Sequence, residues 1–340
     1  METLLKEFKT ELQEKLIELI WNQWCILGVQ GNGNKKSSYW IDPEALILFT
    51  CSLGRREPRL FDEMLDWLNS FFGYINLQRL KSLSNTGYFT SKSVLNAIAF
   101  SIPESKWGMK INNSDKKQVD EPLFFFKDGK PMLPFGESDA VFKAHGYLRG
   151  KLLLRGYSKL FDPYNPSALL LSLRALFGTN ARSEILLYLI THPGPAIVNS
   201  TQLSREIAFA QKTVQTILVN MSQSGYVQRN VLGRETMYSI RIELRDALLL
   251  NLSKPPVWLN WVNVYSFFDE VLGKLFKSDF DKLEQMLQVL ELRLIIKKYI
   301  PVLNICGLKG IDFTEGPAEQ DAFIDWFSKI MMKIVKRLLD

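Results

Sequence analysis

The stretch 180–241 constrains the fold of this 340-residue chain more than any other part of the sequence. It contains three short segments with the apolar spacing of amphipathic helices, at 181–190, 200–208 and 209–224. Gly225 follows the third segment, and two segments rich in strand-forming residues then flank a turn at 232–235. Such an order requires two short helices to pack at a steep angle against a third, so we expect apolar residues at fixed positions in each of them.

The apolar residues of these segments stand where a shared core needs them. One face of each segment carries the set Ile185, Leu186, Leu189, Leu203, Ile207, Val214, Ile217, Leu218 and Met221. Ser200 or Thr201 can cap the second helix. Gly225 stands where the third helix must stop in a left-handed residue. The stretch therefore predicts a compact three-helix unit that continues into a hairpin.

The opposite face of the third segment is polar. It carries Gln211, Lys212, Thr213, Gln215, Thr216 and Asn220. Amide and hydroxyl groups near the N-terminus of such a helix can hydrogen-bond to base edges in the major groove of DNA. Arg229 precedes the predicted turn and Arg234 lies within it, where arginine can reach the phosphate backbone or the minor groove. Over 200–241, five Lys and Arg residues stand against two Glu residues, a net charge of +3.

Here the sequence resembles the winged-helix domains of MarR- and ArsR-like transcriptional regulators, and the winged helices that accompany some nucleotidyltransferases. The resemblance covers residues 178–241 and depends on the order of the elements and on the motifs at 177–178, 181–185, 203–207, 213–214, 225–227, 233–234 and 238–240. It implies a winged helix-turn-helix with a recognition helix near 210–224, a wing near 228–240, and binding to double-stranded DNA.

Two positions depart from the usual pattern of these domains. They usually have glycine in the turn and serine or threonine as the cap of the third helix, where this chain has Ala208 and Ala210. A missing N-cap costs a helix about 1 kcal/mol, which a packed fold can absorb.

The rest of the chain is predicted to be helical on both sides of this stretch. A chain of 340 residues exceeds one typical core, so we expect a mainly α, multi-domain protein with a central winged helix. The predicted parts are an N-terminal helical domain, a polar loop with a hairpin and a basic connector, a winged-helix domain and a C-terminal helical region, at 1–100, 101–165, 166–242 and 243–340. The apolar stripe of the last helix, from Phe323 to Leu338, can be core or a dimer face.

Residues 140–161 form a basic connector that contains no acidic residue. Its cations are Lys143, Arg149, Lys151, Arg155 and Lys159. One interpretation is an auxiliary arm that meets phosphates beside the winged helix, through Lys143, Arg149, Lys151 and Arg155. The other is a connector whose apolar residues, 152–154, pack on a neighbour while the charges are solvated.

No motif indicates an enzyme. The glycine-rich loop 30–38 lacks a glycine directly before lysine and follows a helix, so it is not a P-loop. Asp62, Glu63 and Asp66 are interpreted as a solvated helix face, and neither His145 nor His192 has a motif partner, although His192 can face the last carbonyls of its helix. The Gly-Ser pair and paired aspartates of a nucleotidyltransferase are also absent. We therefore expect no catalysis, no cofactor and no metal.

The composition is that of a folded protein without a membrane segment. Apolar residues make up 46% and the net charge is +6, which suits an anionic partner without requiring one. The N-terminus lacks a signal pattern, no apolar run reaches the roughly 18 residues of a membrane span, and the spacing of Cys25, Cys51 and Cys306 indicates reduced core thiols. We expect a cytoplasmic location.

Together these patterns predict a sequence-specific DNA-binding regulator. Paired half-sites raise affinity, so we expect a homodimer, and any small-molecule effector is left open. The alternative is a non-catalytic interaction or structural protein whose winged helix docks a protein partner.

Overall fold

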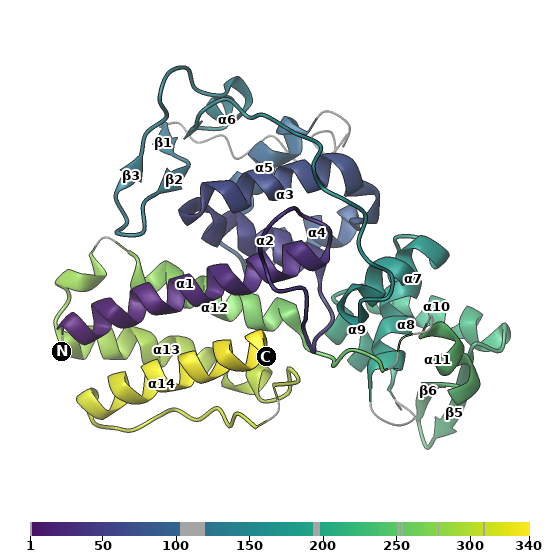
Figure 1. Ribbon diagram of the computed structural model, residues 1–340. Helices are drawn as coiled ribbons and strands as arrows, with labels where there is room; N and C mark the ends of the chain where they lie inside the picture. Colours follow the sequence, from purple (N-terminus) through teal and green to yellow (C-terminus); the bar gives the residue numbers. More distant parts are fainter. Residues whose placement is uncertain are drawn as a thin grey trace.

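The computed structural model describes residues 2–102, 120–192, 198–249, 252, 254–277, 279–308 and 310–340, and it is mainly α-helical (Figure 1). The mainly α class predicted from the sequence is confirmed, while the division into several domains and the winged helix stay predictions. In the described part of the chain, no helix combines the length and apolar character that crossing a membrane requires.

The N-terminal region consists of helices, as expected. They are α1 (Glu2–Ile26), α2 (Pro43–Leu53), α3 (Pro58–Phe71), α4 (Leu77–Asn85) and α5 (Lys92–Ser101), with short 3-10 turns η1 (Gly54–Arg56) and η2 (Phe72–Tyr74). Helix α2 begins as the sequence predicted, because Asp42 accepts a hydrogen bond from the backbone N–H of Ala45 (3.1 Å) and Pro43 opens the helix.

The C-terminal region packs directly on the N-terminal one. Its helices are α12 (Trp261–Leu275), α13 (Gln285–Leu303) and α14 (Gln320–Leu339), preceded at α13 by the turn η7 (Phe280–Lys282). Helix α14 lies along α1 (Figure 1), where the rings of Phe8 and Phe327 meet at 5.9 Å, and Phe49 of α2 stacks on Tyr265 of α12 at 4.6 Å. The apolar stripe of the last helix is core, because Phe323, Phe327, Ile334 and Leu338 are buried within this chain.

Between the helical regions lies a segment of short strands. The strands β1 (Glu121–Pro122) and β4 (Tyr147–Leu148) pair in parallel, and β2 (Phe124–Phe125) and β3 (Pro131–Met132) form the expected hairpin. Helix α6 (Ala140–Ala144) precedes β4. The polar loop expected at 101–121 falls largely outside the described residues.

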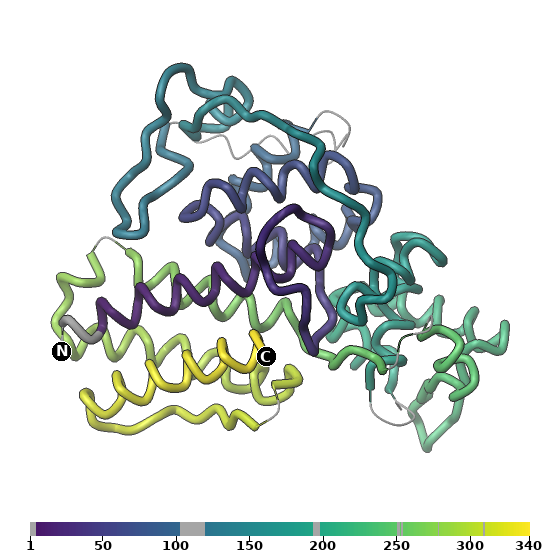
Figure 2. The backbone as a smooth tube through the Cα atoms, in the orientation of Figure 1, coloured from purple at the N-terminus to yellow at the C-terminus, as the bar shows by residue number. Residues whose placement is uncertain are grey.

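An extended run of chain then leads to the second half of the molecule (Figure 2). There η6 (Pro166–Ala168), α7 (Leu169–Phe177), α8 (Ala181–Thr191), α9 (Ser200–Ile207), α10 (Gln211–Gln223), β5 (Val227–Leu232), β6 (Glu235–Ile240) and α11 (Ile242–Leu248) gather at one end of the molecule. The hairpin β5–β6 extends away from α1 and α14 (Figure 1). The domain boundaries expected from the sequence stay a prediction.

Candidate nucleic-acid interface

Residues 180–241, named here the helix–hairpin unit, have the core that the sequence predicted. The apolar residues assigned to its three helices are buried, with Ile217 half-buried. Helix α10 packs against α8, α9 and β5, so these short elements support one another. Short helices in proteins owe most of their stability to packing of their apolar faces in this way.

The turn between α9 and α10 is left-handed at Ala208. This residue has φ 57° and ψ 49°, and it is the only described residue other than glycine with a positive φ. The backbone N–H of Phe209 donates to the carbonyl oxygen of Ser204 (3.1 Å), which closes the end of α9. Glycine adopts this conformation without steric cost, and alanine does not. Ala208, which stands where winged-helix domains usually have glycine, is therefore a strained residue.

The helix caps differ from the prediction at one of two places. The cap of α9 is Asn199, one residue before the predicted Ser200 or Thr201. Its side chain accepts a hydrogen bond from the backbone N–H of Gln202 (2.8 Å). At α10 the N-cap is Ala210, which makes no side-chain cap bond. The free N–H groups at the start of α10 are thus left for water or for a bound anion.

The end of α10 and the hairpin follow the predicted geometry. Gly225 has φ 79°, and the N–H of Tyr226 donates to the carbonyl of Met221 (2.9 Å), as in a Schellman motif. Strands β5 and β6 pair in register from Val227 with Ile240 to Leu232 with Glu235. Gly233, with φ 62°, takes the first central position of the two-residue turn, where glycine suits a type II′ hairpin.

An isolated β-bridge, which the sequence did not predict, joins Val198 to the hairpin. Val198 and Tyr238 exchange backbone hydrogen bonds of 3.1 and 2.9 Å just before α9 begins. This bridge fixes the start of α9 against β6. The order of elements in the unit is three helices followed by two strands, with this bridge before the second helix.

The predicted contact residues on α10 and the hairpin all face solvent. Gln211, Lys212, Thr213, Gln215, Thr216, Arg229 and Arg234 are exposed, as is Asn220. Gln211 Nε2 donates to Thr201 Oγ1 (2.7 Å), and Thr216 Oγ1 donates to the carbonyl of Lys212 (2.9 Å). Within the described part of the chain, the two arginines and Lys212 form no ion pair. Their charges are available to a partner.

The outward charge of the unit is more positive than its sequence charge. Glu206 turns inward, where Asn260 Nδ2 donates to its Oε2 (3.3 Å) and burial raises the pKa of Glu206. Over 200–241 the exposed charges are then those of Glu235 and of five cations, Arg205, Lys212, Arg229, Arg234 and Arg241.

The basic connector does not behave as a free basic arm, and Arg149 is the clearest correction. Its guanidinium is buried and pairs with Asp62 through Nη1 and Nη2 (2.8 and 3.1 Å). It also lies over the rings of Phe142 (5.0 Å) and Phe124 (5.4 Å). Arg149 therefore holds the connector to α3 and is not a phosphate ligand.

Asp66 corrects the prediction that its helix face is solvated. The carboxylate is buried and accepts hydrogen bonds from the backbone N–H groups of four consecutive residues, at 2.6–3.1 Å: Arg155, Gly156, Tyr157 and Ser158. Burial raises the pKa of Asp66, but the hydrogen bonds outweigh it and hold that pKa below its usual value. Of the connector's predicted ligands, Lys143, Lys151 and Arg155 remain exposed.

A buried charge network, formed by Asp42, Glu44, Arg79, Arg174 and Glu184, fixes the unit to the N-terminal helices. Arg79 donates to Asp42 Oδ1 and Oδ2 (2.7 and 2.6 Å) and to Glu44 Oε2 (2.7 Å). Its Nε donates to the carbonyl oxygen of Ile207 (3.0 Å), directly before the strained turn. The turn between α9 and α10 is thereby held by a side chain of α4.

Arg174 of α7 makes the second set of contacts in this network. It donates to both oxygens of Glu44 (2.7 and 2.8 Å) and, through Nε, to Glu184 Oε1 of α8 (3.1 Å). Three acids face two arginines, and burial raises the pKa of Glu184 although Arg174 opposes it. Sequence analysis missed these pairings because the partners are up to 130 residues apart.

His192 and the three cysteines were also singled out in the sequence. His192 Nδ1 lies 2.6 Å from the carbonyl oxygen of Tyr188, in the arrangement expected for a helix end. Cys25, Cys51 and Cys306 are buried and free. Among the described residues no cluster of His, Cys, Asp and Glu is arranged to hold a metal ion.

The chain was compared with known protein families, sequences and structures. No protein-family model, no curated protein sequence and no solved structure matches this chain.

Proposed function

We propose that the helix–hairpin unit is a winged helix-turn-helix and that the protein binds double-stranded DNA through it. One observation carries this proposal: the outer face of α10 and the hairpin is exposed, and its cations Lys212, Arg229 and Arg234 form no ion pair with any residue that the structure describes. Basic side chains that no acid neutralises can displace the counterions of DNA, and this release drives binding. The order of helices and strands in the unit also supports it.

In the proposed complex, α10 enters the major groove with its N-terminus first. Gln211, Thr213 and Gln215 would contact base edges, and Lys212 would contact phosphate. The backbone N–H groups of the first turn of α10, which Ala210 does not cap, also favour a phosphate oxygen at this end of the helix.

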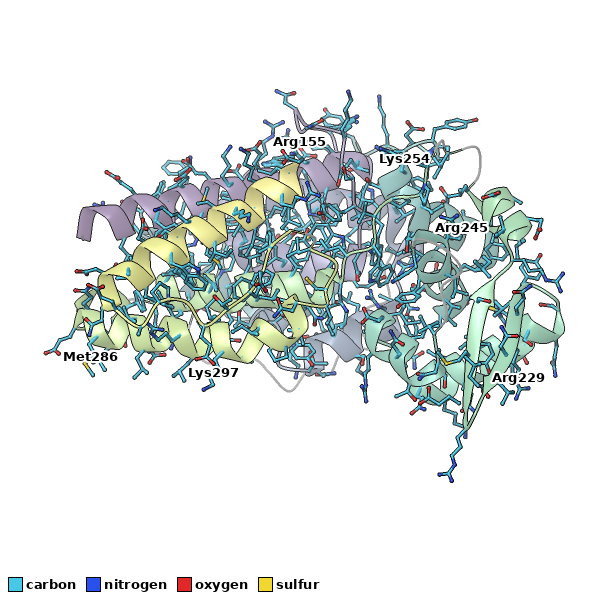
Figure 3. All side chains as sticks on the ribbon, turned by 90° about the horizontal axis from the view of Figure 1, so that it is seen from below. Arg155, Arg229, Arg245, Lys254, Met286 and Lys297 are labelled. Carbon is cyan, nitrogen blue, oxygen red and sulfur yellow. The ribbon has the colours of Figure 1, made fainter. Side chains whose placement is uncertain are left out.

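The hairpin would lie along the adjacent backbone. Arg229 and Arg234 reach phosphate or the minor groove from β5 and the turn. Figure 3 shows Arg229 at the hairpin end of the molecule, well apart from Arg155 of the connector. The exposed cations of the connector are therefore not assigned to this interface.

We also propose that the protein acts as a transcriptional regulator in the cytoplasm and binds as a homodimer. The buried charge network would keep α9 and α10 in a fixed orientation relative to the helical body. Two such units at a fixed spacing would recognise paired half-sites one turn of DNA apart.

Fluorescence anisotropy with a labelled random duplex tests the proposal. The wild type should bind at low salt, and the combined variant Lys212→Ala, Arg229→Ala, Arg234→Ala should bind at least about tenfold more weakly, since each charged contact contributes about 1.5–3 kcal/mol before salt screening. A variant of the connector, Lys151→Ala with Arg155→Ala, is the matched control. Absence of wild-type binding at low salt contradicts the proposal.

The tip of the hairpin favours a second function. Val231 and Leu232 are 67% and 58% exposed there, and exposed apolar side chains are typical of protein interfaces. A winged helix that docks a protein would use these two residues. In that case Val231→Ser with Leu232→Ser would abolish partner binding, while the DNA proposal predicts little change in affinity for duplex.

A further inference from the structure

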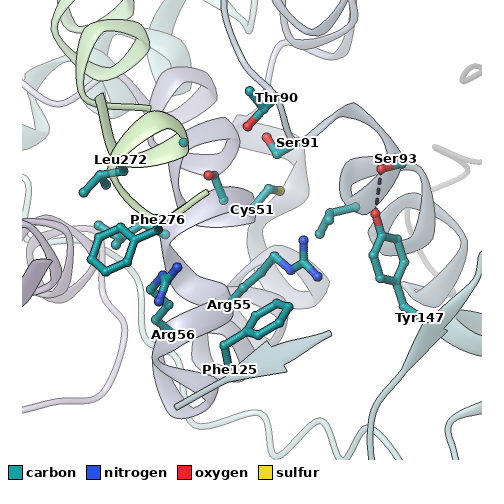
Figure 4. Close-up of a pocket in the computed structure, with 14 residues that line it drawn as sticks. Cys51, Arg55, Arg56, Thr90, Ser91, Ser93, Phe125, Tyr147, Leu272 and Phe276 are labelled. Atoms are coloured by element: carbon teal, nitrogen blue, oxygen red, sulfur yellow. Dashed lines mark hydrogen bonds between the residues drawn. The ribbon is translucent and has the colours of Figure 1, made fainter. Parts of the chain in front are cut away.

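A small pocket lies at the C-terminal end of α2, away from the helix–hairpin unit (Figure 4). Its volume is about 220 Å³. Arg55 and Arg56 enter it from η1, and Phe276 of the turn after α12 and Tyr147 of β4 form facing walls. The pocket therefore combines two cations with aromatic surface.

Arg56 has no polar partner for one of its terminal nitrogens. Its Nη1 is buried and makes no hydrogen bond within the described residues. The guanidinium instead lies over the ring of Phe276, 3.9 Å from its centre. Burial and, to a smaller extent, the neighbouring Arg55 lower the pKa of Arg56 to about 10. Arg56 as a whole is half-buried, but a charged donor such as its Nη1 is costly to bury without an acceptor, and a bound anion would remove that cost.

Arg55, in contrast, already has partners. Its Nη2 donates to Glu121 Oε1 (3.0 Å) and to the carbonyl of Pro122 (2.9 Å), and its Nε donates to the carbonyl of Leu123 (2.8 Å). Glu121 balances one of the two adjacent arginines. The charge left over in the pocket is that of Arg56.

The other polar groups of the pocket do not neutralise Arg56. Ser93 Oγ and Tyr147 Oη lie 2.6 Å apart on the wall and can present a hydroxyl to a ligand. Asp269 stands behind the wall, where it accepts from the N–H and Oγ1 of Thr90 (2.8 and 2.9 Å). Burial raises the pKa of Asp269, which favours its neutral form.

We propose that this pocket binds a small organic anion, a carboxylate or a phosphate monoester, with its charged oxygens on Arg56 and its apolar part against Phe125 and Leu272 of the pocket wall. An apolar cavity of about 150 Å³ accommodates benzene, so 220 Å³ accommodates a ligand with one ring or a short chain. Arg56 supplies two donors in a planar fork, which matches the oxygens of either group. The proposal does not depend on DNA binding.

Isothermal titration with the full chain at constant ionic strength tests the pocket. The probes are benzoate, phenyl phosphate and inorganic phosphate, with benzyl alcohol as the uncharged control. We expect saturable binding of benzoate or phenyl phosphate, with the stronger probe identifying the anionic group, and no binding of benzyl alcohol. Binding of inorganic phosphate as tight as that of phenyl phosphate would contradict a role for the aromatic wall.

Variants at Arg56 locate the site. Arg56→Met keeps an apolar stem, loses the charge, and should weaken binding by about tenfold or more. Arg56→Lys keeps the charge and should retain part of the affinity, while Arg182→Met, at an exposed arginine of α8, should bind as the wild type does. Equal affinity of Arg56→Met and wild type, or no saturable binding of any anion to the wild type, overturns the proposal.

Discussion

The basic connector and the helix–hairpin unit are both rich in Lys and Arg, yet the structure uses their charges differently. In the connector, Arg149 is buried against Asp62, and Asp66 holds four successive backbone N–H groups. In the unit, Lys212, Arg229 and Arg234 are exposed and form no ion pair among the described residues. The difference shows that a count of charges does not reveal which of them a partner can reach. What decides is whether an acidic residue far away in the sequence pairs with the cation.

The largest expected effect comes from Arg174, which has the same charge as Arg229 but no access to solvent. Arg174→Met leaves the buried carboxylates of Glu44 and Glu184 without this cation and should lower the free energy of unfolding by about 3–5 kcal/mol. Urea denaturation followed by circular dichroism measures this free energy of unfolding. Arg182→Met, an exposed control on α8, should change it by less than about 0.5 kcal/mol. A loss below about 1 kcal/mol for Arg174→Met would show that the network does not hold the unit.

Arg149 separates the two roles of a basic residue most directly. Arg149→Ala removes two charged hydrogen bonds and should destabilise the fold by about 2 kcal/mol, while the affinity for duplex DNA stays unchanged. Thermal unfolding and anisotropy on the same sample give both values. A variant of unchanged stability with weakened DNA binding would instead mean that Arg149 contacts phosphate, as the auxiliary-arm interpretation predicts.

Asp66 predicts a pH dependence for the connector. Its pKa is lowered in the folded state, so its contribution to stability is present at neutral pH and is lost as pH falls below about 4, the usual pKa of aspartate. Asp66→Asn should be less stable than wild type at pH 7 by about 1–2 kcal/mol, and the difference should shrink at pH 3. A constant difference across this range would mean that the charge of Asp66 has no role.

The smallest effect is expected at the turn of the helix–hairpin unit. Ala208→Gly removes the steric cost of a left-handed alanine and should raise the free energy of unfolding by up to about 1 kcal/mol. Ala210→Ser, which adds a cap to α10, should stabilise by a similar amount. Destabilisation by Ala208→Gly would contradict the left-handed turn.

Local patterns predicted much of this fold. The caps at Asp42 and Gly225, the hairpin turn at Gly233 and the buried faces of α8 to α10 depend on residues close in sequence, and the structure has them where they were expected. The cap of α9 was assigned one or two residues late because Asn, Ser and Thr stand together and each can cap a helix.

Contacts between distant residues could not be predicted in this way. Helical periodicity shows that α1 and α14 have apolar faces, but not that they pack on each other. The partners of Arg79, Arg149 and Asp66 lie on other elements, and one sequence contains no signal that links them. At the candidate interface the exposed residues were therefore predicted, while the network that positions them was not.

The salt dependence of DNA binding tests the central claim most directly. The logarithm of the binding constant of wild type for a duplex should fall linearly with the logarithm of salt concentration. In Lys212→Ala, Arg229→Ala, Arg234→Ala the slope should be shallower by about 0.9 for each phosphate contact removed. The connector variant Lys151→Ala, Arg155→Ala should keep the wild-type slope. A slope that changes in the connector variant and not in the triple variant would contradict the account.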